Sequence, residues 1–258
     1  MTTADQDRAC GSVLTYDELD STNSEAMRRV AAGERGPLWI LANRQTAGRG
    51  RSGRNWASPT GNFAASLIFE PGCPTAMVPQ LSLVAGVAVH RALDAVWPAG
   101  AADGRLRLKW PNDIMVAGAK MGGILVESTN FGTGLVAVIG IGVNIAICPD
   151  DAERAATCLA EYSTKLPGVE DFRSTLATRL RDCLDTWQFG VGFGALRAEW
   201  LGRSGPIGEP MSVNTGIGRV SGTFAGLDTD GALLLCDANM RQLRFTFGDV
   251  TLNTTAKV

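Results

Sequence analysis

The chain has 258 residues, of which 45% are hydrophobic and 19% are charged, and its formal net charge is -2. Enough apolar residues are present to form a sizeable core, so the composition excludes a generally disordered protein. The sequence pI of about 5.5 excludes a general attraction to nucleic acid. The length suits one large domain, or a large domain followed by a small one.

The six cysteines form no CxxC pair and show no metal-ligand spacing, and the chain has a single histidine. We therefore expect reduced, structural thiols. The N-terminus is too polar for a signal peptide, and the most apolar run, residues 134–147, is shorter than the ~20 residues of a membrane span. These features predict a cytoplasmic protein that has no contact with a membrane.

The first predicted elements are a short strand at residues 13–16 and a helix at about residues 23–32, which ends at a glycine. Thr22, with a glutamate three residues later, has the spacing of a capping box. Capping needs only one of the neighbouring polar residues Ser21, Thr22 and Asn23. The other polar side chains are therefore candidates to bind a ligand.

Residues 45–56 read QTAGRGRSGRNW and lie between predicted strands at residues 37–42 and 62–69. Glycine lets a ligand approach the backbone closely, and arginine offers a planar fork of donors that matches phosphate and carboxylate oxygens. This glycine–arginine loop lacks the GxxxxGK[ST] pattern of a P-loop. A solvated basic loop and an RNA-binding RGG-like segment are the alternatives. We favour an anion-binding loop that closes as a lid over its ligand.

The strongest helical pattern covers residues 77–96, and Pro98 follows it as a stop signal. A loop is expected at residues 99–104. His90 lies on the predicted helix and has no acidic or thiol partner at a suitable spacing, so we assign it a structural or surface position.

The predicted strands of the next segment lie at residues 106–110, 114–116, 121–128 and 134–144. Lys120 begins the third of these strands, and Gly122 and Gly123 follow it. Paired glycines in a strand imply that a ligand or another backbone lies close by. The polar residues Asn112 and Asp113 precede the same hairpin, which makes Lys120 a stronger candidate for function than an ordinary turn lysine.

Residues 150–165 are predicted to form a loop with a short helical region, and residues 172–189 an amphipathic helix. Beyond residue 202 the pattern changes to short strands separated by Gly, Asp and Asn turns. These strands are expected near Met211, Val220, Leu234, Arg244 and Val250. We place a domain boundary between residues 203 and 204, with a small β-barrel at residues 204–258.

With one histidine, the chain offers no Ser-His-Asp or Cys-His arrangement. What remains is a set of arginine, lysine, asparagine and glycine residues with one motif-like carboxylate, Asp113. Such a set suits phosphoryl or nucleotidyl transfer, in which positioning and charge neutralisation matter more than proton transfer. An attacking carboxylate needs no general base, because it is already ionised at about pH 7.

Five motifs in register resemble the biotin–protein ligase family and cover roughly residues 13–255. They are Thr22-Asn23, the run from Gln45 to Arg54, Lys109-Trp110-Pro111-Asn112-Asp113, the run from Lys120 to Glu127, and Gly140-Ile141-Gly142-Val143-Asn144. The family also has long forms with an N-terminal DNA-binding domain. Only about a dozen residues precede Val13 here, so the resemblance implies a short form with no sequence-specific DNA binding.

The resemblance implies a two-step reaction with ATP and Mg²⁺. Biotin first becomes biotinyl-5′-AMP, and a specific lysine of a biotin carboxyl carrier protein domain, part of a biotin-dependent carboxylase, then receives the biotin. It also implies an α/β (α+β) fold, in which a mixed-sheet catalytic domain like a class II tRNA synthetase core (residues 1–203) precedes an SH3-like barrel. A lipoate–protein ligase of the same superfamily and a non-enzymatic nucleotide- or RNA-binding module are the rival hypotheses.

The family's site residues carry over onto this sequence position by position. The residues implied to bind biotin are Ser21, Thr22, Asn23, Gln45, Gly48, Arg49, Arg51, Lys120, Gly122 and Gly123. The residues implied to bind the nucleotide are Arg51, Arg54, Trp56, Asn112, Lys120 and Asn144. Lys120 and Arg51 take the catalytic roles, and Asp113 is implied to hold Mg²⁺. Cys158 stands where serine is expected, and we give this difference little functional weight.

Overall fold

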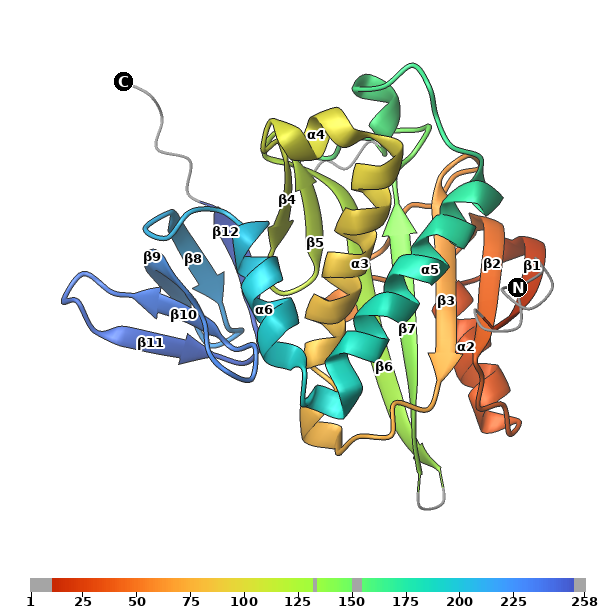
Figure 1. Cartoon of the computed structure of the whole chain (residues 1–258), viewed down its shortest axis with the longest axis horizontal. Coiled ribbons are helices and arrows are strands. Elements are labelled where there is room, and N and C mark those ends of the chain that lie inside the picture. Colours follow the sequence, from red (N-terminus) through yellow and green to blue (C-terminus); the bar gives the residue numbers. More distant parts are fainter. Residues whose placement is uncertain (1–10, 132–133, 150–154, 253–258) are drawn as a thin grey trace.

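The computed structural model describes residues 11–131, 134–149 and 155–252. These residues form a seven-stranded mixed sheet, helices on both of its faces, and a separate five-stranded sheet (Figure 1). The predicted mixed α/β class is confirmed. Within the described ranges, no helix is both long enough and apolar enough to cross a membrane.

The main sheet contains β1 to β7 in the spatial order β1-β2-β3-β7-β6-β5-β4, with β1 and β2 parallel and the other neighbours antiparallel. The strand bounds are β1 (Ser12–Leu19), β2 (Leu38–Gln45), β3 (Phe63–Phe69), β4 (Leu106–Lys109), β5 (Asp113–Val116), β6 (Ala119–Phe131) and β7 (Gly134–Val143). The apolar runs of β2, β3 and β7 place these strands where both faces of the sheet are covered.

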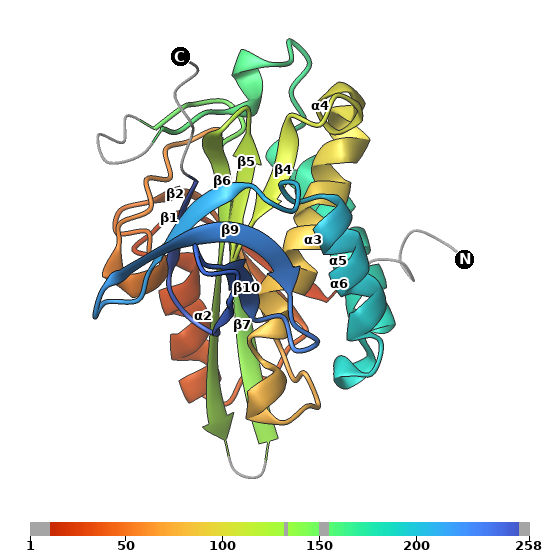
Figure 2. The same cartoon turned by 90° about the vertical axis from the view of Figure 1, so that its left-hand side faces the viewer.

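Helices α3 (Gln80–Val96), α5 (Val169–Trp187) and α6 (Phe193–Gly202) cover one face of the main sheet, and α2 (Thr22–Ala31) lies on the other (Figure 2). Alternating residues of β2 enter two different cores. Leu38 and Ile40 pack with α2, whereas Trp39 and Leu41 join the large core that also contains the α3 and α5 residues. On its face, α2 contacts β2, β3 and β7. The part of that face beyond β7 is therefore left for other segments.

The C-terminal sheet is antiparallel and has the order β11-β10-β9-β8-β12. Its strands are β8 (Pro210–Asn214), β9 (Arg219–Leu227), β10 (Leu233–Cys236), β11 (Gln242–Phe245) and β12 (Asp249–Leu252). All five strands were predicted. The sheet joins the larger unit near the end of β4, where Trp110 Nε1 donates to Gly231 O at 3.1 Å and Lys109 Nζ donates to Val250 O at 3.2 Å.

Two predictions of local structure are wrong. The N-cap of α2 is Ser21, whose hydroxyl accepts from Ser24 N at 3.5 Å, and Thr22 is the first helical residue. The capping box fails because the carboxylate of Glu25 binds Arg28 and Arg29 instead of turning back to the backbone. The expected loop at residues 99–104 is mostly the short helix α4 (Pro98–Ala102), since proline is well suited to the first turn of a helix.

The prediction of reduced thiols throughout is also wrong, because Cys148 and Cys158 form a disulfide. Two backbone hydrogen bonds hold the adjoining segments side by side, from Leu159 N to Asn144 O at 3.0 Å and from Ala160 N to Ile145 O at 2.9 Å. Cysteine spacing carried no sign of this pairing. Three other cysteines, Cys73, Cys183 and Cys236, are free thiols in the described chain.

Candidate functional site

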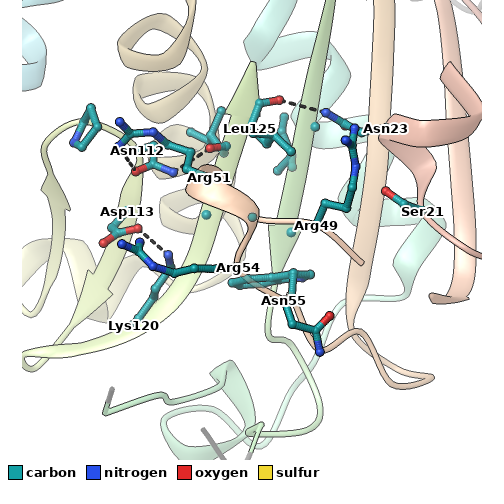
Figure 3. Close-up of a pocket in the computed structure, with 18 of the residues that line it drawn as sticks. Ser21, Asn23, Arg49, Arg51, Arg54, Asn55, Asn112, Asp113, Lys120 and Leu125 are labelled. Atoms are coloured by element: carbon teal, nitrogen blue, oxygen red, sulfur yellow. Dashed lines mark hydrogen bonds and ion pairs between the residues drawn. The ribbon is translucent and has the colours of Figure 1, made fainter. Parts of the chain in front are cut away.

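A pocket lies on the α2 face of the main sheet, between the start of α2, strands β5 to β7, the glycine–arginine loop and the edge of the C-terminal sheet (Figure 3). Most of the predicted site residues line it. They are Ser21, Thr22, Asn23, Gln45, Arg49, Arg51, Arg54, Trp56, Asn112, Asp113, Lys120 and Gly123. The structure therefore brings together residues that are spread over about a hundred positions of the sequence.

The glycine–arginine loop forms a narrow hairpin. Arg49 pairs with Asn55, and Gly50 N donates to Arg54 O at 2.8 Å. A side chain at Gly48 would place its Cβ 2.4 Å from Trp56 O, so only glycine allows the two arms to meet there. The turn of the hairpin carries the arginines over the pocket.

Glycines in the floor of the pocket make room for side chains that lie flat across the sheet. A Cβ at Gly140 would lie 2.0 Å from Asn23 Oδ1, and one at Gly142 would lie 2.5 Å from the indole of Trp56. Both glycines belong to β7 and face the same side of the sheet. Lys120 Nζ lies 5.6 Å from the centre of the Trp56 ring, within range of a cation–π contact.

The α2 end of the pocket is polar and neutral. Thr22 N donates to Gln45 Oε1 at 2.8 Å, and Ser66 Oγ lies 2.8 Å from Thr22 Oγ1 and 2.6 Å from Asn23 Oδ1. Thr22 and Asn23 are 4% and 3% exposed. Ser21 is the residue that caps the helix, so Thr22 and Asn23 keep their polar groups for this network.

The opposite end of the pocket is cationic and centres on Asp113, which is 5% exposed. Its carboxylate oxygens lie 2.5 Å from Lys120 Nζ and 2.7 Å from Lys109 Nζ. Burial alone raises the pKa of the Asp113 carboxyl, but the two ammonium groups outweigh this effect and hold its pKa below the usual value. The carboxylate is therefore ionised at neutral pH and fixes both lysines.

Three arginines of the loop reach different partners. Arg49 is ion paired with Glu127 and Arg54 with Asp249. Arg51 differs, because in the described part of the chain its hydrogen bonds go to neutral oxygens, at 3.3 Å to Asn112 Oδ1 and at 3.5 Å to Gly248 O. Burial lowers the pKa of the Arg51 guanidinium from its ordinary value. A partly buried cation that has no carboxylate bound to it favours an anionic ligand at this point.

Comparison with known proteins assigns this arrangement to a family. The model of the biotin/lipoate A/B protein ligase family matches residues 19–144. The chain is 42% identical over 234 residues to the biotin–[acetyl-CoA-carboxylase] ligase of Paracoccus denitrificans, covering 87% of this chain and 94% of that protein. The chain belongs to the biotin–protein ligase family.

Two further biotin–protein ligases agree with this assignment. The biotin–[acetyl-CoA-carboxylase] ligase of Mycobacterium tuberculosis is 32% identical over 259 residues, which cover 95% of this chain and 92% of that one. The solved biotin protein ligase of Aquifex aeolicus, in complex with biotin and ATP, is 25% identical with a TM-score of 0.78 and covers 93% of this chain and 98% of that chain. The similarity thus extends over both sheets.

Three residues expected from the biotin–protein ligase motifs do not line the pocket. Gly48 lies in one arm of the loop, against Trp56 O. Gly122 lies in β6 opposite Val143 of β7, and an added Cβ there would be 2.9 Å from Gly142 O. Asn144 is 2% exposed, and its amide donates to Thr157 O at 3.0 Å. Their predicted contacts with biotin or nucleotide stay predictions.

Sequence reasoning missed the contribution of the C-terminal sheet. Asp249 and Val250 of β12 line the pocket. No local pattern marks either residue, because each reaches the pocket only through the packing of the two sheets. Glu127 was noted as part of a motif but not as a site residue, although it binds Arg49. Glu127 is two residues beyond Leu125, which lines the pocket, so both side chains are on the same face of β6. This spacing was the available signal that Glu127 lies near the site.

The predicted Mg²⁺ site has one strong candidate ligand. No group of three or more His, Cys, Asp or Glu side chains in the described ranges is placed to hold a metal ion. Mg²⁺ is commonly held by one or two carboxylates together with substrate phosphates and water. Asp113 fits that pattern, since it is ionised and lines the pocket.

Proposed function

We propose that this protein is an ATP-dependent ligase that activates biotin as biotinyl-5′-AMP and transfers it to a specific lysine of a biotin carboxyl carrier protein domain. The observation that carries the proposal is that a single pocket has one neutral end and one cationic end. Its neutral, hydrogen-bonding end suits the ureido ring of biotin. Its cationic end, with Arg51 free of any bound carboxylate among the described residues, suits phosphate oxygens.

In the first step, a biotin carboxylate oxygen attacks the α-phosphorus of ATP. A bond forms between that oxygen and phosphorus, the bond from the α-phosphorus to the bridging oxygen breaks, and pyrophosphate leaves. Negative charge increases on the α-phosphate oxygens. Lys120, fixed by Asp113 at 2.5 Å, and Arg51 stabilise this charge. Because Asp113 and the pocket wall fix these cations in advance, little reorganisation is needed in the transition state.

In the second step, the neutral amine of the carrier lysine attacks the carbonyl carbon of the mixed anhydride. An amide bond forms, AMP leaves with the electron pair of the broken carbon–oxygen bond, and the ammonium formed releases a proton to solvent. The arginines that bind the phosphate also keep the intermediate in the pocket until the carrier arrives. By covering the pocket, the same arginines exclude water, and this protects the anhydride from hydrolysis.

We propose that Mg²⁺ binds together with ATP and that Asp113 is its protein ligand. When bound, the ion neutralises phosphate charge and supplies Lewis-acid polarisation. The role of the chain itself is to keep Asp113 ionised, which the neighbouring lysines achieve by lowering its pKa.

The finer features of the family extend the proposal. We infer that residues 1–203 form a catalytic domain like a class II tRNA synthetase core and that the five C-terminal strands close into an SH3-like barrel. The requirement for ATP supports a cytoplasmic location. The Cys148–Cys158 disulfide is the feature that fits a reducing compartment least well, so a thiol count on protein trapped in intact cells tests the location.

Transfer to a carrier tests the function as a whole. The protein is incubated with biotin, ATP, Mg²⁺ and a biotin carboxyl carrier domain, and the product is blotted with streptavidin. The expected result is one biotin on the carrier lysine and none on a carrier in which that lysine is replaced by arginine. Labelling with lipoate instead of biotin supports the lipoate–protein ligase alternative. The absence of any labelling, with an intact fold, rejects both activities.

A further inference from the structure

Glu127 of β6 joins two segments that meet at the biotin end of the pocket. Its Oε2 accepts from Asn23 Nδ2 at 2.9 Å, and the same oxygen is ion paired with Arg49 of the glycine–arginine loop. Glu127 itself is not among the lining residues. Figure 3 shows the Arg49 side chain directed toward Asn23. One carboxylate thus connects the loop to the start of α2.

The contact continues through the polar network of the pocket. Asn23 Oδ1 lies 2.6 Å from Ser66 Oγ, Ser66 Oγ lies 2.8 Å from Thr22 Oγ1, and Thr22 N donates to Gln45 Oε1. Gln45 is the first residue of the glycine–arginine loop. Glu127 is therefore connected to the loop at two places. Its ion pair reaches Arg49 directly, and the chain of hydrogen bonds reaches Gln45 through the floor of the pocket.

A carboxylate can only accept hydrogen bonds, so Glu127 determines the orientation of the Asn23 amide. The Nδ2 group must face Glu127 and the carbonyl of Leu125, at 3.3 Å, and Oδ1 must face Ser66. Asn23 is nearly fully buried, which makes a wrongly oriented or unpaired amide costly. This orientation in turn decides which polar atoms the neighbouring Thr22 offers to a ligand.

Glu127 contributes little to the stability of the fold through its ion pair. The Arg49 and Glu127 side chains are 42% and 28% exposed, and ion pairs of such exposure have small effects on unfolding. Loss of the pair should therefore change the site without unfolding the protein. This separates the role of Glu127 from that of a core residue.

We propose that Glu127 is a positioning residue that fixes Arg49 over the α2 end of the pocket and orients Asn23, and so sets the affinity for the biotin end of the ligand. The proposal rests on the proposed function. It predicts a selective loss of biotin binding when Glu127 is altered, since the residues that it holds belong to the neutral end of the pocket. The cationic end does not depend on it, because Asp113 holds Lys120.

Two substitutions separate the two contacts of Glu127. In Glu127→Gln, the side-chain carbonyl still accepts from Asn23, but the charge that holds Arg49 is lost. In Glu127→Ala, both contacts are lost. We expect the KM for biotin in ATP–pyrophosphate exchange to rise about two- to five-fold for Glu127→Gln and about ten-fold or more for Glu127→Ala, with the KM for ATP nearly unchanged.

Glu18→Gln is the matched control, because Glu18 of β1 also forms an exposed ion pair with an arginine, Arg44 of β2, in the same sheet. It should leave both KM values unchanged. In an Arg49→Ala background, Glu127→Gln should have no further effect on the KM for biotin, because the charged partner is already gone.

Thermal unfolding checks that each variant is folded. An unchanged KM for biotin in folded Glu127→Ala overturns the proposal, as does an equal rise of both KM values, which indicates a general structural role. Wild-type protein without biotin-dependent exchange is a different result, because it contradicts the proposed function before the role of Glu127 is reached.

Discussion

Arg54 of the glycine–arginine loop is ion paired with Asp249, the first residue of β12, although 195 positions separate them in the sequence. One of the two contacts, from Arg54 Nη1 to Asp249 Oδ1, is 3.0 Å long. Both residues line the pocket. The C-terminal sheet is therefore part of the site, since it holds one of the cations expected to meet ATP.

Replacing Asp249 with alanine should weaken ATP binding. Arg54 then has to be ordered by the nucleotide itself, which costs conformational entropy that the ion pair otherwise removes in advance. We expect the KM for ATP to rise about three- to ten-fold, with a smaller change in the KM for biotin. Steady-state pyrophosphate exchange measures both values. A lower KM for ATP in the variant means that Asp249 competes with the phosphates for Arg54.

Replacing Lys120 with methionine should slow adenylate formation about 10²- to 10³-fold while the fold survives, because one donor to the transferring phosphate is lost. Single-turnover formation of biotinyl-5′-AMP is the measurement. Lys109→Met is the matched control, since Lys109 also contacts Asp113 but does not line the pocket. It should be far less impaired. Near-normal turnover in Lys120→Met rules out the catalytic assignment.

Replacing Arg51 with glycine should allow the intermediate to escape. Loss of one charge-assisted hydrogen bond weakens binding by roughly 1.5–3 kcal/mol, which corresponds to about ten- to a hundred-fold faster release. Wild type and variant are incubated with biotin, ATP and an unrelated lysine-rich protein, which is then blotted for biotin. The variant should label this bystander strongly. Equal labelling by both proteins, with adenylate still formed, shows that Arg51 does not retain the intermediate.

His90 should make the stability of the protein depend on pH. It is 3% exposed, and burial, followed by the nearby charge of Arg203, lowers its pKa to about 4. Arg203 donates to Nδ1, and Nε2 lies 3.3 Å from Leu106 O, an arrangement that fits the neutral ring. The folded structure thus contains a histidine that resists protonation.

The unfolded chain takes up this proton at its ordinary pKa of about 6.5, whereas the folded chain does so only near its lowered pKa. Stability is therefore complete above the unfolded pKa and is lost as the pH falls toward the folded pKa. We expect the free energy of unfolding to fall by about 2 kcal/mol between about pH 7.5 and pH 5. Urea denaturation measures this change. In His90→Gln, the same pH interval should leave the free energy of unfolding almost constant.

Local patterns in the sequence predicted the elements of the fold well. All five C-terminal strands lie where turn residues separated short apolar runs, and β6 begins at Ala119, two residues before the predicted start at Met121. The neutral end of the pocket also followed from local reasoning, because one cap residue was enough for α2. Ser21 rather than Thr22 is the N-cap of α2, because the Glu25 carboxylate binds Arg28 and Arg29. The spacing of a capping box does not predict these ion pairs.

The features of the site and the fold that the sequence did not predict depend on contacts between segments that are separate in the sequence. Asp249 enters the pocket only because the C-terminal sheet lies against the end of β4. Cys148 and Cys158 pair because the chain folds back on itself after β7. Asn144 is buried, and its amide donates to Thr157 O. In each case the partner comes from a segment that no periodicity or motif connects.

Biotin-dependent exchange of pyrophosphate into ATP tests the central claim most directly, because it reports the first chemical step without a carrier protein. Purified protein is mixed with ATP, Mg²⁺ and labelled pyrophosphate, with biotin, lipoate or no acid added. The account predicts rapid exchange with biotin and almost none with lipoate or without an added acid. Exchange that proceeds equally well without biotin, or that occurs with lipoate alone, would contradict it.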